Sequence, residues 1–328
     1  MHKSSFCRLF FSILSADSKQ ALSGPTRDHG LFVVSANQKR MFHSNYDDKH
    51  SWSVLRHIYE GNLKGSGKKY ACFALNISDS SYDDFERYKF IWDEATVRVA
   101  VDGSANPLAK RRHLTTTDII SGDFDSIDPK LIQRLQSPRR ANKVPLQRSE
   151  DRDELPMSPH VIHTPCQKET DFTKAIRVVM GLKPDVHNFF GLYHNEGFRL
   201  DHLFALVNTL HLIKKNIFLI NTRGETLSWL LIPGHHTILK PKGQEICSLV
   251  PFTGATEVKT QGLQYNITPP MVLSYGGIIS TSNLCHEQRE KVVIDTNRDL
   301  LWSVDLRSRK LAHHKDNSTA NKENELSR

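Results

Sequence analysis

Several aspartates of this chain stand directly after segments that are typical of buried strands. Asp102 follows the apolar run 97–101 (VRVAV), and Asp123 and Asp125 come just after the run 118–121 (DIIS). The carboxyl ends of parallel strands share one edge of a sheet, and ligands of open α/β sheets bind in the crevice beyond that edge. We therefore expect these carboxylates to gather at one site.

The chemistry that such a cluster favours is the binding of Mg²⁺. Neighbouring carboxylates repel one another unless a cation joins them, and oxygen ligands without His or Cys suit Mg²⁺ that bridges to substrate phosphates. In extended geometry Asp123 and Asp125 point to one side and Phe124 points away, while Gly122 lets the backbone bend. Taken alone, the sequence GDFDS fits equally a turn with two solvated acids.

Further candidates lie in one loop and at two predicted helix starts. The small-residue loop DGSAN, which ends in Asn106, suits the close approach of a ligand, although it also fits a plain turn. Asp171 follows the predicted N-cap Thr170, where an acid also complements the positive helix end. Arg199 and Asp201 open another helix in the sequence RLDH. Arg199 is suited to hold phosphate there, and a surface helix start is the alternative.

The elements that must position these residues alternate between short apolar strands and amphipathic helices. Strands are predicted at 70–76, 97–101, 118–121, 161–164, 188–190 and 217–220. Helices are predicted at 82–95, from Thr170 onward, and at 200–213. This alternation predicts an α/β catalytic domain with a mainly parallel sheet over 68–228. After residue 233 only short strand candidates remain, which predicts an all-β sandwich domain over 229–307.

Three segments are predicted to lie outside these domains. Residues 1–67 form an N-terminal extension that is largely disordered, apart from a short helix around 52–58. Residues 136–160 form a disordered insertion with many charges and several prolines, and 308–328 form a disordered tail.

Composition excludes some functions and favours a reduced compartment. The net charge is +8, but much of the excess lies in runs without aromatic residues, so we expect solvated segments and no nucleic-acid partner. No apolar run is long enough to span a bilayer, so no membrane partner is expected.

The five cysteines are scattered without metal-binding spacing, which favours free thiols. The apolar run 10–14 is short and interrupted, so we expect a cytoplasmic protein rather than one with a targeting peptide.

Taken together and in order, the motifs resemble the thiamine pyrophosphokinase family of the eukaryotic type. The segments are DGSAN, SGDFDSI, TPCQKETDFTKAI, RLDH with VNTL, LLIPGHH, and GLQYNIT followed by ISTSN, and the resemblance runs from 68 to 306. It implies a nucleotide-binding α/β domain followed by a β-sandwich. It also implies a homodimer with active sites between subunits, and transfer of the pyrophosphoryl group of ATP to the hydroxyl of thiamine, giving thiamine diphosphate and AMP.

The resemblance also implies roles for individual residues. The implied Mg²⁺ ligands are Asp123, Asp125 and Asp171. Asp102 would complete the acidic cluster, and Arg199 and Asp201 would address the phosphates.

On the thiamine side, the resemblance implies contacts from Gln167, Tyr265 and Ser282. Tyr265 would stack on the pyrimidine ring, and Ser282 would form a hydrogen bond to it. The chain departs from the family pattern at Tyr265, where animal relatives carry Trp, and in the longer loop 190–199 before Arg199. Two other functions remain open at this point, a Mg²⁺-dependent phosphohydrolase and a protein that binds thiamine or nucleotide without turnover.

Overall fold

A computed structural model describes residues 49–111, 113–136, 159–194 and 199–307. The chain divides into two units, 1–45 and 46–328, and all described residues belong to the second. Most of the predicted extension and insertion, and the whole predicted tail, lie outside the described residues. No helix within the described ranges is long and apolar enough to cross a membrane.

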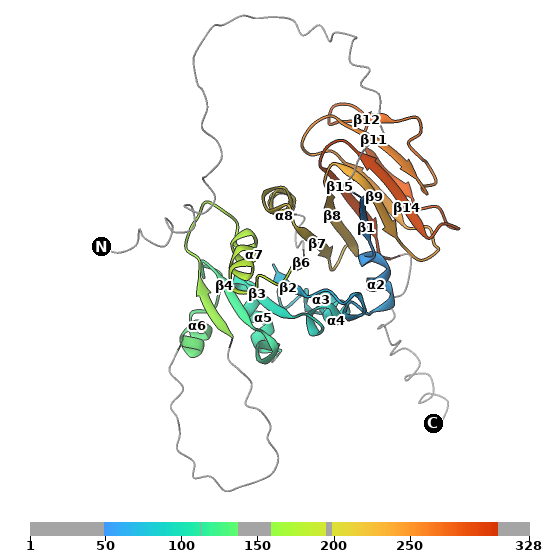
Figure 1. The fold of residues 1–328 in the computed structure, drawn as a ribbon. Coiled ribbons are helices and arrows are strands. Elements are labelled where there is room, and N and C mark those ends of the chain that lie inside the picture. Colours follow the sequence, from blue (N-terminus) through green and yellow to red (C-terminus); the bar gives the residue numbers. More distant parts are fainter. Residues whose placement is uncertain (1–48, 112, 137–158, 195–198, 308–328) are drawn as a thin grey trace, which may run out of the picture. The chain divides into compact units, whose positions relative to one another are not determined.

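A ten-stranded mixed sheet forms the frame of the described unit (Figure 1). In spatial order its strands are β13 (Ser280–Leu284), β10 (Ile246–Val250), β15 (Leu300–Asp305), β8 (Thr226–Leu231), β7 (Asn216–Asn221), β6 (Asn188–Tyr193), β2 (Tyr70–Leu75), β3 (Val97–Val101), β4 (Ile119–Gly122) and β5 (His160–His163). The six strands from β7 to β5 are parallel, and the pairing becomes antiparallel from β7 to β8 onward. The predicted parallel sheet is therefore confirmed.

The parallel strands are apolar because both of their faces are covered. Along β2 every residue is buried, and side chains alternate between two cores. Cys72 and Ala74 face one core, whereas Ala71 and Phe73 face the other. This explains why the sequence of β2 is a continuous apolar run instead of an alternation of polar and apolar residues.

Helices cover both faces of the parallel sheet. The core that contains Cys72 is packed by α3 (Tyr82–Arg87), α4 (Lys89–Asp93), α5 (Ala105–Lys110) and α6 (Pro129–Gln136). The other core is packed by α7 (Asp171–Leu182) and α8 (Leu200–Ile213). Short 3₁₀ helices occupy Lys64–Ser66, Asp102–Ser104 and His113–Thr116. The single helix predicted over 82–95 is divided in two at Tyr88.

A second, five-stranded sheet packs with the C-terminal strands of the first. Its order is β1 (Lys49–Trp52), β9 (Gly234–Leu239), β14 (Lys291–Thr296), β11 (Thr256–Gln261) and β12 (Met271–Leu273). The predicted all-β sandwich is confirmed, but it is not separated from the α/β domain. β8 pairs with β7 in antiparallel orientation and continues the same sheet. The predicted boundary at 228/229 therefore falls inside β8. One core reaches from Trp92 of α4 to Trp302 of β15.

The predicted N-terminal extension is wrong at its C-terminal end, because residues 49–66 are part of the fold. β1 pairs in parallel with β9. The helix α2 (Val54–Glu60) buries Leu55 and Ile58 completely and ends at Gly61, which has a left-handed φ of 63°. The polar strand β1 finds its partner almost 200 residues away, so its local sequence carried no strand pattern.

Candidate active site

The order in which the chain adds strands to the parallel sheet reverses at β2. A cavity lies beside this point. From β2 the chain proceeds through β3 and β4 to β5, and then returns to β6 on the other side of β2. Connections that leave adjacent strands in opposite directions open a crevice at their carboxyl ends. A cavity of about 670 Å³ lies there, and its lining includes Asn76, Asp102, Asn106, Asp171 and His202.

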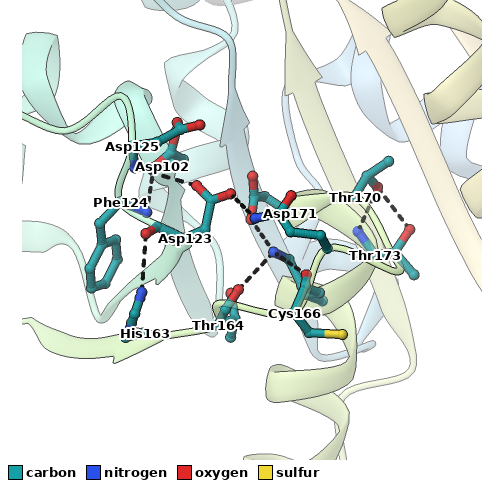
Figure 2. Close-up of polar contacts among 12 residues, drawn as sticks. Asp102, Asp123, Phe124, Asp125, His163, Thr164, Cys166, Thr170, Asp171 and Thr173 are labelled. Carbon is teal, nitrogen blue, oxygen red and sulfur yellow. Dashed lines mark hydrogen bonds and ion pairs between the residues drawn. The ribbon is translucent and has the colours of Figure 1, made fainter.

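Three carboxylates form a tight cluster at this edge. Asp102 follows β3, and Asp123 and Asp125 follow β4 (Figure 2). One oxygen from each side chain lies within 4.8 Å of the others. This is the only such group of His, Cys, Asp or Glu side chains in the part of the chain that the structure describes. The donor set consists of carboxylate oxygens, which suits a hard divalent cation such as Mg²⁺.

The cluster depends on close approach between the ends of β3 and β4. A Cβ atom on Gly122 would lie 2.8 Å from Cβ and 3.0 Å from Cα of Asp102, so only glycine lets the two backbones come so near. Phe124 adopts a left-handed φ of 68°. The expected extended geometry of 123–125 is therefore wrong. The tight bend still turns Phe124 away from the carboxylates, and its ring stacks on His163 with 5.0 Å between ring centroids.

Asp102 is half-buried and its backbone is strained, with a φ of 46°. Its Oδ1 accepts a hydrogen bond from the backbone N–H of Phe124 at 3.2 Å, which ties the two strand ends together. Burial raises the pKa of Asp102 above its ordinary value of 3.8. The nearby carboxylates of Asp171 and Asp125 act in the same direction, and hydrogen bonds from Gly103 and Ser126 oppose them. A cation would relieve this repulsion.

Asp123 has the opposite electrostatic environment. Its Oδ2 accepts a hydrogen bond from Nε2 of Gln167 at 2.8 Å, and its Oδ1 accepts one from the N–H of Asp125 at 3.3 Å. The Gln167 bond is the main reason why the pKa of Asp123 is lowered from 3.8. Gln167, which the resemblance implied as a thiamine contact, here positions an acid of the cluster.

Asp171 lies at the same cavity but outside the tight group. It is the first residue of α7, and Thr170 caps that helix by accepting the N–H of Thr173 at 3.3 Å, as predicted. Oδ1 of Asp171 lies 2.6 Å from Nζ of Lys174, so the carboxylate already has a cationic partner. The structure thus brings Asp102, rather than Asp171, together with Asp123 and Asp125.

Asn106 lines the cavity, and its side chain already bridges two parts of the site. Its Nδ2 donates to the carbonyl of Ser126 at 2.9 Å, and its Oδ1 accepts the N–H of Asp128 at 2.9 Å. The donor and the acceptor of the side-chain amide therefore both hold the loop that follows β4, and this loop carries Asp123 and Asp125.

Arg199 and Asp201 pair with each other at the exposed start of α8. Nε of Arg199 donates to Oδ1 of Asp201 at 2.9 Å, and this guanidinium lowers the pKa of Asp201 well below its ordinary range. Neither residue contributes to the lining of the cavity, where α8 is represented by His202, Ala205 and Leu206. The structure does not bring this pair into contact with the acid cluster.

The other two predicted thiamine contacts, Tyr265 and Ser282, lie in the β-sandwich. The side chain of Asn283 joins them, because its Oδ1 accepts the N–H of Tyr265 and its Nδ2 donates to the carbonyl of Tyr265. Tyr265 is 66% exposed. Ser282 is also exposed, with a left-handed φ of 55° where the pairing of β10 and β13 shifts register.

Sequence reasoning missed several residues of the site. Lys174 is buried beneath Asp171, and Ser126 donates to Oδ1 of Asp125 at 2.7 Å. Asn76, after β2, has a φ of 53° and lies near His202. The position of Lys174, three residues after Asp171 on one helix face, is a signal that could have identified their pairing.

Comparisons with known proteins agree with this architecture. A family model described as thiamin pyrophosphokinase, catalytic domain, matches residues 88–220, and one described as thiamin pyrophosphokinase, vitamin B1 binding domain, matches 235–301. These two models of one family match more than half of the chain between them. The chain therefore belongs to the thiamine pyrophosphokinase family.

Relatives and solved structures of the same family extend over most of the chain. Thiamine pyrophosphokinase 3 of Oryza sativa subsp. japonica is 29% identical over 240 residues, covering 66% of this chain and 81% of the relative. Thiamine pyrophosphokinase 2 of the same organism is 29% identical over 282 residues, covering 79% and 94%. The crystal structure of yeast thiamin pyrophosphokinase matches with a TM-score of 0.56 at 19% identity, covering 79% of this chain and 91% of that one, which supports the fold.

Proposed function

We propose that this protein is a thiamine pyrophosphokinase, which transfers the pyrophosphoryl group of ATP to the hydroxyl of thiamine and releases AMP. The observation that carries the proposal is the group of Asp102, Asp123 and Asp125, whose oxygens lie within 4.8 Å of one another at the carboxyl edge of the sheet. The cavity of about 670 Å³ beside them offers room for the reacting groups of the two substrates.

The residues present fit a Mg²⁺ ion, because the donor set is entirely carboxylate and carries repulsion that a cation would remove. Asp102, Asp123 and Asp125 would hold the ion, and Asp171 would take part from the other side of the cavity. When bound, Mg²⁺ supplies charge neutralisation at the phosphate oxygens of ATP.

The chain's own side chains set the geometry of that site. Gln167 donates to Asp123 and favours its ionised form. Asn106 fixes the loop that carries the two acids after β4. Positioning of this kind is the main contribution a protein makes to phosphoryl-group transfer, because the attacking hydroxyl must lie in line with the phosphorus atom.

The position of the thiamine residues supports the further proposal of a homodimer. In the ten-stranded sheet Ser282 lies on the first strand, β13, whereas Asp123 follows the ninth strand, β4. At about 4.8 Å for each interstrand step, the two lie roughly 38 Å apart along the sheet, which is far more than the length of a thiamine molecule. A second copy of the chain would bring its Tyr265 and Ser282 to the acids of the first.

Exposed apolar side chains agree with such a partner. Phe204 on α8, Tyr265 and Tyr275 are 50%, 66% and 58% exposed. Phe204 and Tyr275 both lie close to the ring of Phe252, so they form a continuous aromatic surface. Aromatic residues are enriched where protein surfaces bind one another.

The activity is tested by incubating purified protein with ATP, Mg²⁺ and thiamine and measuring AMP and thiamine diphosphate. We expect AMP formation that requires thiamine and is lost in Asp123→Asn. Phosphate release without thiamine would instead identify a phosphohydrolase. Tight thiamine binding in calorimetry, without turnover, would identify a binding protein. Fractionation of cells with an antibody against the protein would test the predicted cytoplasmic location.

The dimer is tested by mixing two impaired chains and measuring activity at a thiamine concentration well below KM. One chain carries Asp123→Asn, and the other carries Tyr265→Ala together with Ser282→Ala. If each site combines the acids of one copy with the sandwich of the other, an exchanged mixture recovers about a quarter of the wild-type activity, because half of the dimers are mixed and each has one intact site. Recovery of no activity by dimers shown to have exchanged would refute the shared site.

A further inference from the structure

Lys174 is a buried cation beneath the acid cluster, at a position that the proposed chemistry does not use directly. It lies near the start of α7, and only 8% of its side chain is exposed. Lysine is rarely buried without partners because its charge is costly to remove from water. Its contacts therefore indicate what it does.

Three oxygen atoms surround the ammonium group. Nζ donates to the carbonyl of Thr164 at 2.7 Å and to the carbonyl of Cys166 at 3.1 Å. It also lies 2.6 Å from Oδ1 of Asp171. The two carbonyls take two of the three protons of the ammonium, and Asp171 is paired with its charge.

The three oxygens belong to two parts of the site. Asp171 lines the cavity itself. Thr164 and Cys166 belong to the segment between β5 and α7, and Gln167, the next residue, donates to Asp123 at 2.8 Å. Figure 2 draws Thr164, Cys166 and Asp171 in one view with Asp123.

A second contact joins the same segment to the cluster. Nε2 of His163 lies 3.1 Å from the carbonyl oxygen of Asp123. Between His163 and Gln167, the backbone carbonyls of Thr164 and Cys166 are the two groups that Lys174 binds. Lys174 thus fixes this segment between His163 and Gln167, the two residues through which the segment contacts Asp123.

From this geometry we propose that Lys174 is a positioning residue for the metal site: it holds the 164–167 segment and Asp171, and through Gln167 it orients Asp123. The inference rests on the proposed function in that it deepens the role of the same acid cluster. Lys174 is not among the residues that line the cavity, so we infer that its effect on metal binding is exerted through its neighbours.

Removal of the ammonium should loosen both parts at once. Without it the Asp171 carboxylate loses its cationic partner, and two partly buried carbonyls lose a donor. Side chains that orient metal ligands typically contribute about 10- to 100-fold to metal affinity. We expect Lys174→Met to weaken divalent metal binding by about that factor.

Arg177 offers a matched control on the same helix. Its guanidinium donates to both carboxylate oxygens of Glu169, at 3.1 and 2.9 Å from Nε, so it too ties α7 to the segment before it. The Arg177–Glu169 pair makes none of the contacts to Asp123, Gln167 or Asp171. Arg177→Met therefore removes a tether of similar kind that does not lead to the acids.

The experiment compares the full-length wild type, Lys174→Met and Arg177→Met in two measurements. The first is the binding of Mn²⁺ alone, which is monitored through the electron paramagnetic resonance signal of free Mn²⁺. The second is hydrogen exchange of a peptide that spans 164–170. We expect Lys174→Met to lose about 10- to 100-fold in Mn²⁺ affinity and to exchange faster in this peptide, whereas Arg177→Met should change Mn²⁺ affinity by less than about threefold.

Unchanged Mn²⁺ affinity in a folded Lys174→Met protein would overturn the proposal, as would equal losses in the two variants. If Lys174→Met does not fold, Lys174→Gln replaces it, because glutamine keeps a donor for the carbonyls but lacks the charge beside Asp171. Wild-type protein that binds Mn²⁺ but makes no AMP would refute the proposed function alone, since the comparison of variants uses only the metal and the peptide.

Discussion

The acid cluster and the proposed thiamine face of the sandwich are built in opposite ways. Around the cluster, backbone and side-chain donors hold the carboxylates, as Phe124 does for Asp102 and Gln167 for Asp123. On the sandwich, Tyr265 is 66% exposed, and the contacts described for that residue involve its backbone.

The difference shows which part of the proposed site one chain can complete by itself. Carboxylates that repel one another must be held before a cation arrives, so the fold fixes them with internal contacts. A flat aromatic surface gains its binding energy only when a ligand or a partner covers it. The first region is thus preorganised, and the second is left open.

The largest expected effect comes from the preorganised region. Asp123→Asn keeps the shape of the side chain but removes the charge, so we expect kcat to fall about 100- to 1000-fold. The measurement is the steady-state rate of thiamine-dependent AMP formation. Asp83→Asn, at an exposed position in α3, is the control and should retain the wild-type rate. A loss of less than tenfold in Asp123→Asn would mean that the cluster is not the catalytic centre.

A smaller effect is expected from the open region. Tyr265→Ala removes a stacking surface, so we expect KM for thiamine to rise about tenfold, with KM for ATP unchanged. Because the ring is largely exposed, the melting temperature should not change. Tyr265→Phe, which keeps the ring, should behave as the wild type in steady-state kinetics. Equal increases in both KM values would contradict a role limited to thiamine.

The closeness of β3 and β4 predicts a stability difference between two glycines. A Cβ at Gly122 would meet the backbone of Asp102 at 3.0 Å, so we expect Gly122→Ala to destabilise the fold by about 1–3 kcal/mol. Gly181, near the end of α7, has open space around it, and Gly181→Ala should stabilise by about 0.5–1 kcal/mol. Urea unfolding of both variants measures the two changes. Similar stability for the two would show that the strand ends are not tightly packed.

The smallest expected effect is a gain in stability from removing one charge. Burial raises the pKa of Asp102, so in the metal-free protein ionisation of this carboxyl is less favourable in the folded state than in the unfolded state. Its contribution to stability is present below pH 3.8 and declines as the pH rises through the raised pKa.

Asp102→Asn should therefore melt slightly higher than the wild type at neutral pH, with the advantage disappearing at acidic pH. Thermal melts across the pH range, without divalent metal, provide the measurement. A lower melting temperature for Asp102→Asn at neutral pH would contradict the assigned direction of the pKa shift.

Much of the parallel half of the fold was predictable from local sequence. The strand β3 and the helix α8 were predicted with their observed bounds, since apolar runs and helical periodicity are local signals. The polar strand β1 was not predictable, because its pairing with β9 is decided by packing against residues distant in sequence. The continuity of β7 with β8, which joins the two predicted domains, was missed for the same reason.

The candidate site was predicted by residue type and only partly by arrangement. The acids after strands were expected to meet, and Asp102, Asp123 and Asp125 do so. The sequence did not predict that Asn106 and Gln167 use their side-chain amides to hold the site in place. Hydrogen bonds between segments 20 to 44 residues apart depend on how strand ends are juxtaposed, which local spacing does not specify.

By itself, the sequence determined the family of the protein, the alternation of strands and helices, and the chemical character of the site as a carboxylate cluster. These depend on residue types and on local periodicity. Only the tertiary structure decided that Asp171 lies outside the tight group of acids and pairs with Lys174, and that Ser282 and Asp123 lie on distant strands of one sheet. The physical reason is that each of these outcomes depends on strand order and on close backbone approach, as at Gly122, and both arise only when the whole chain packs.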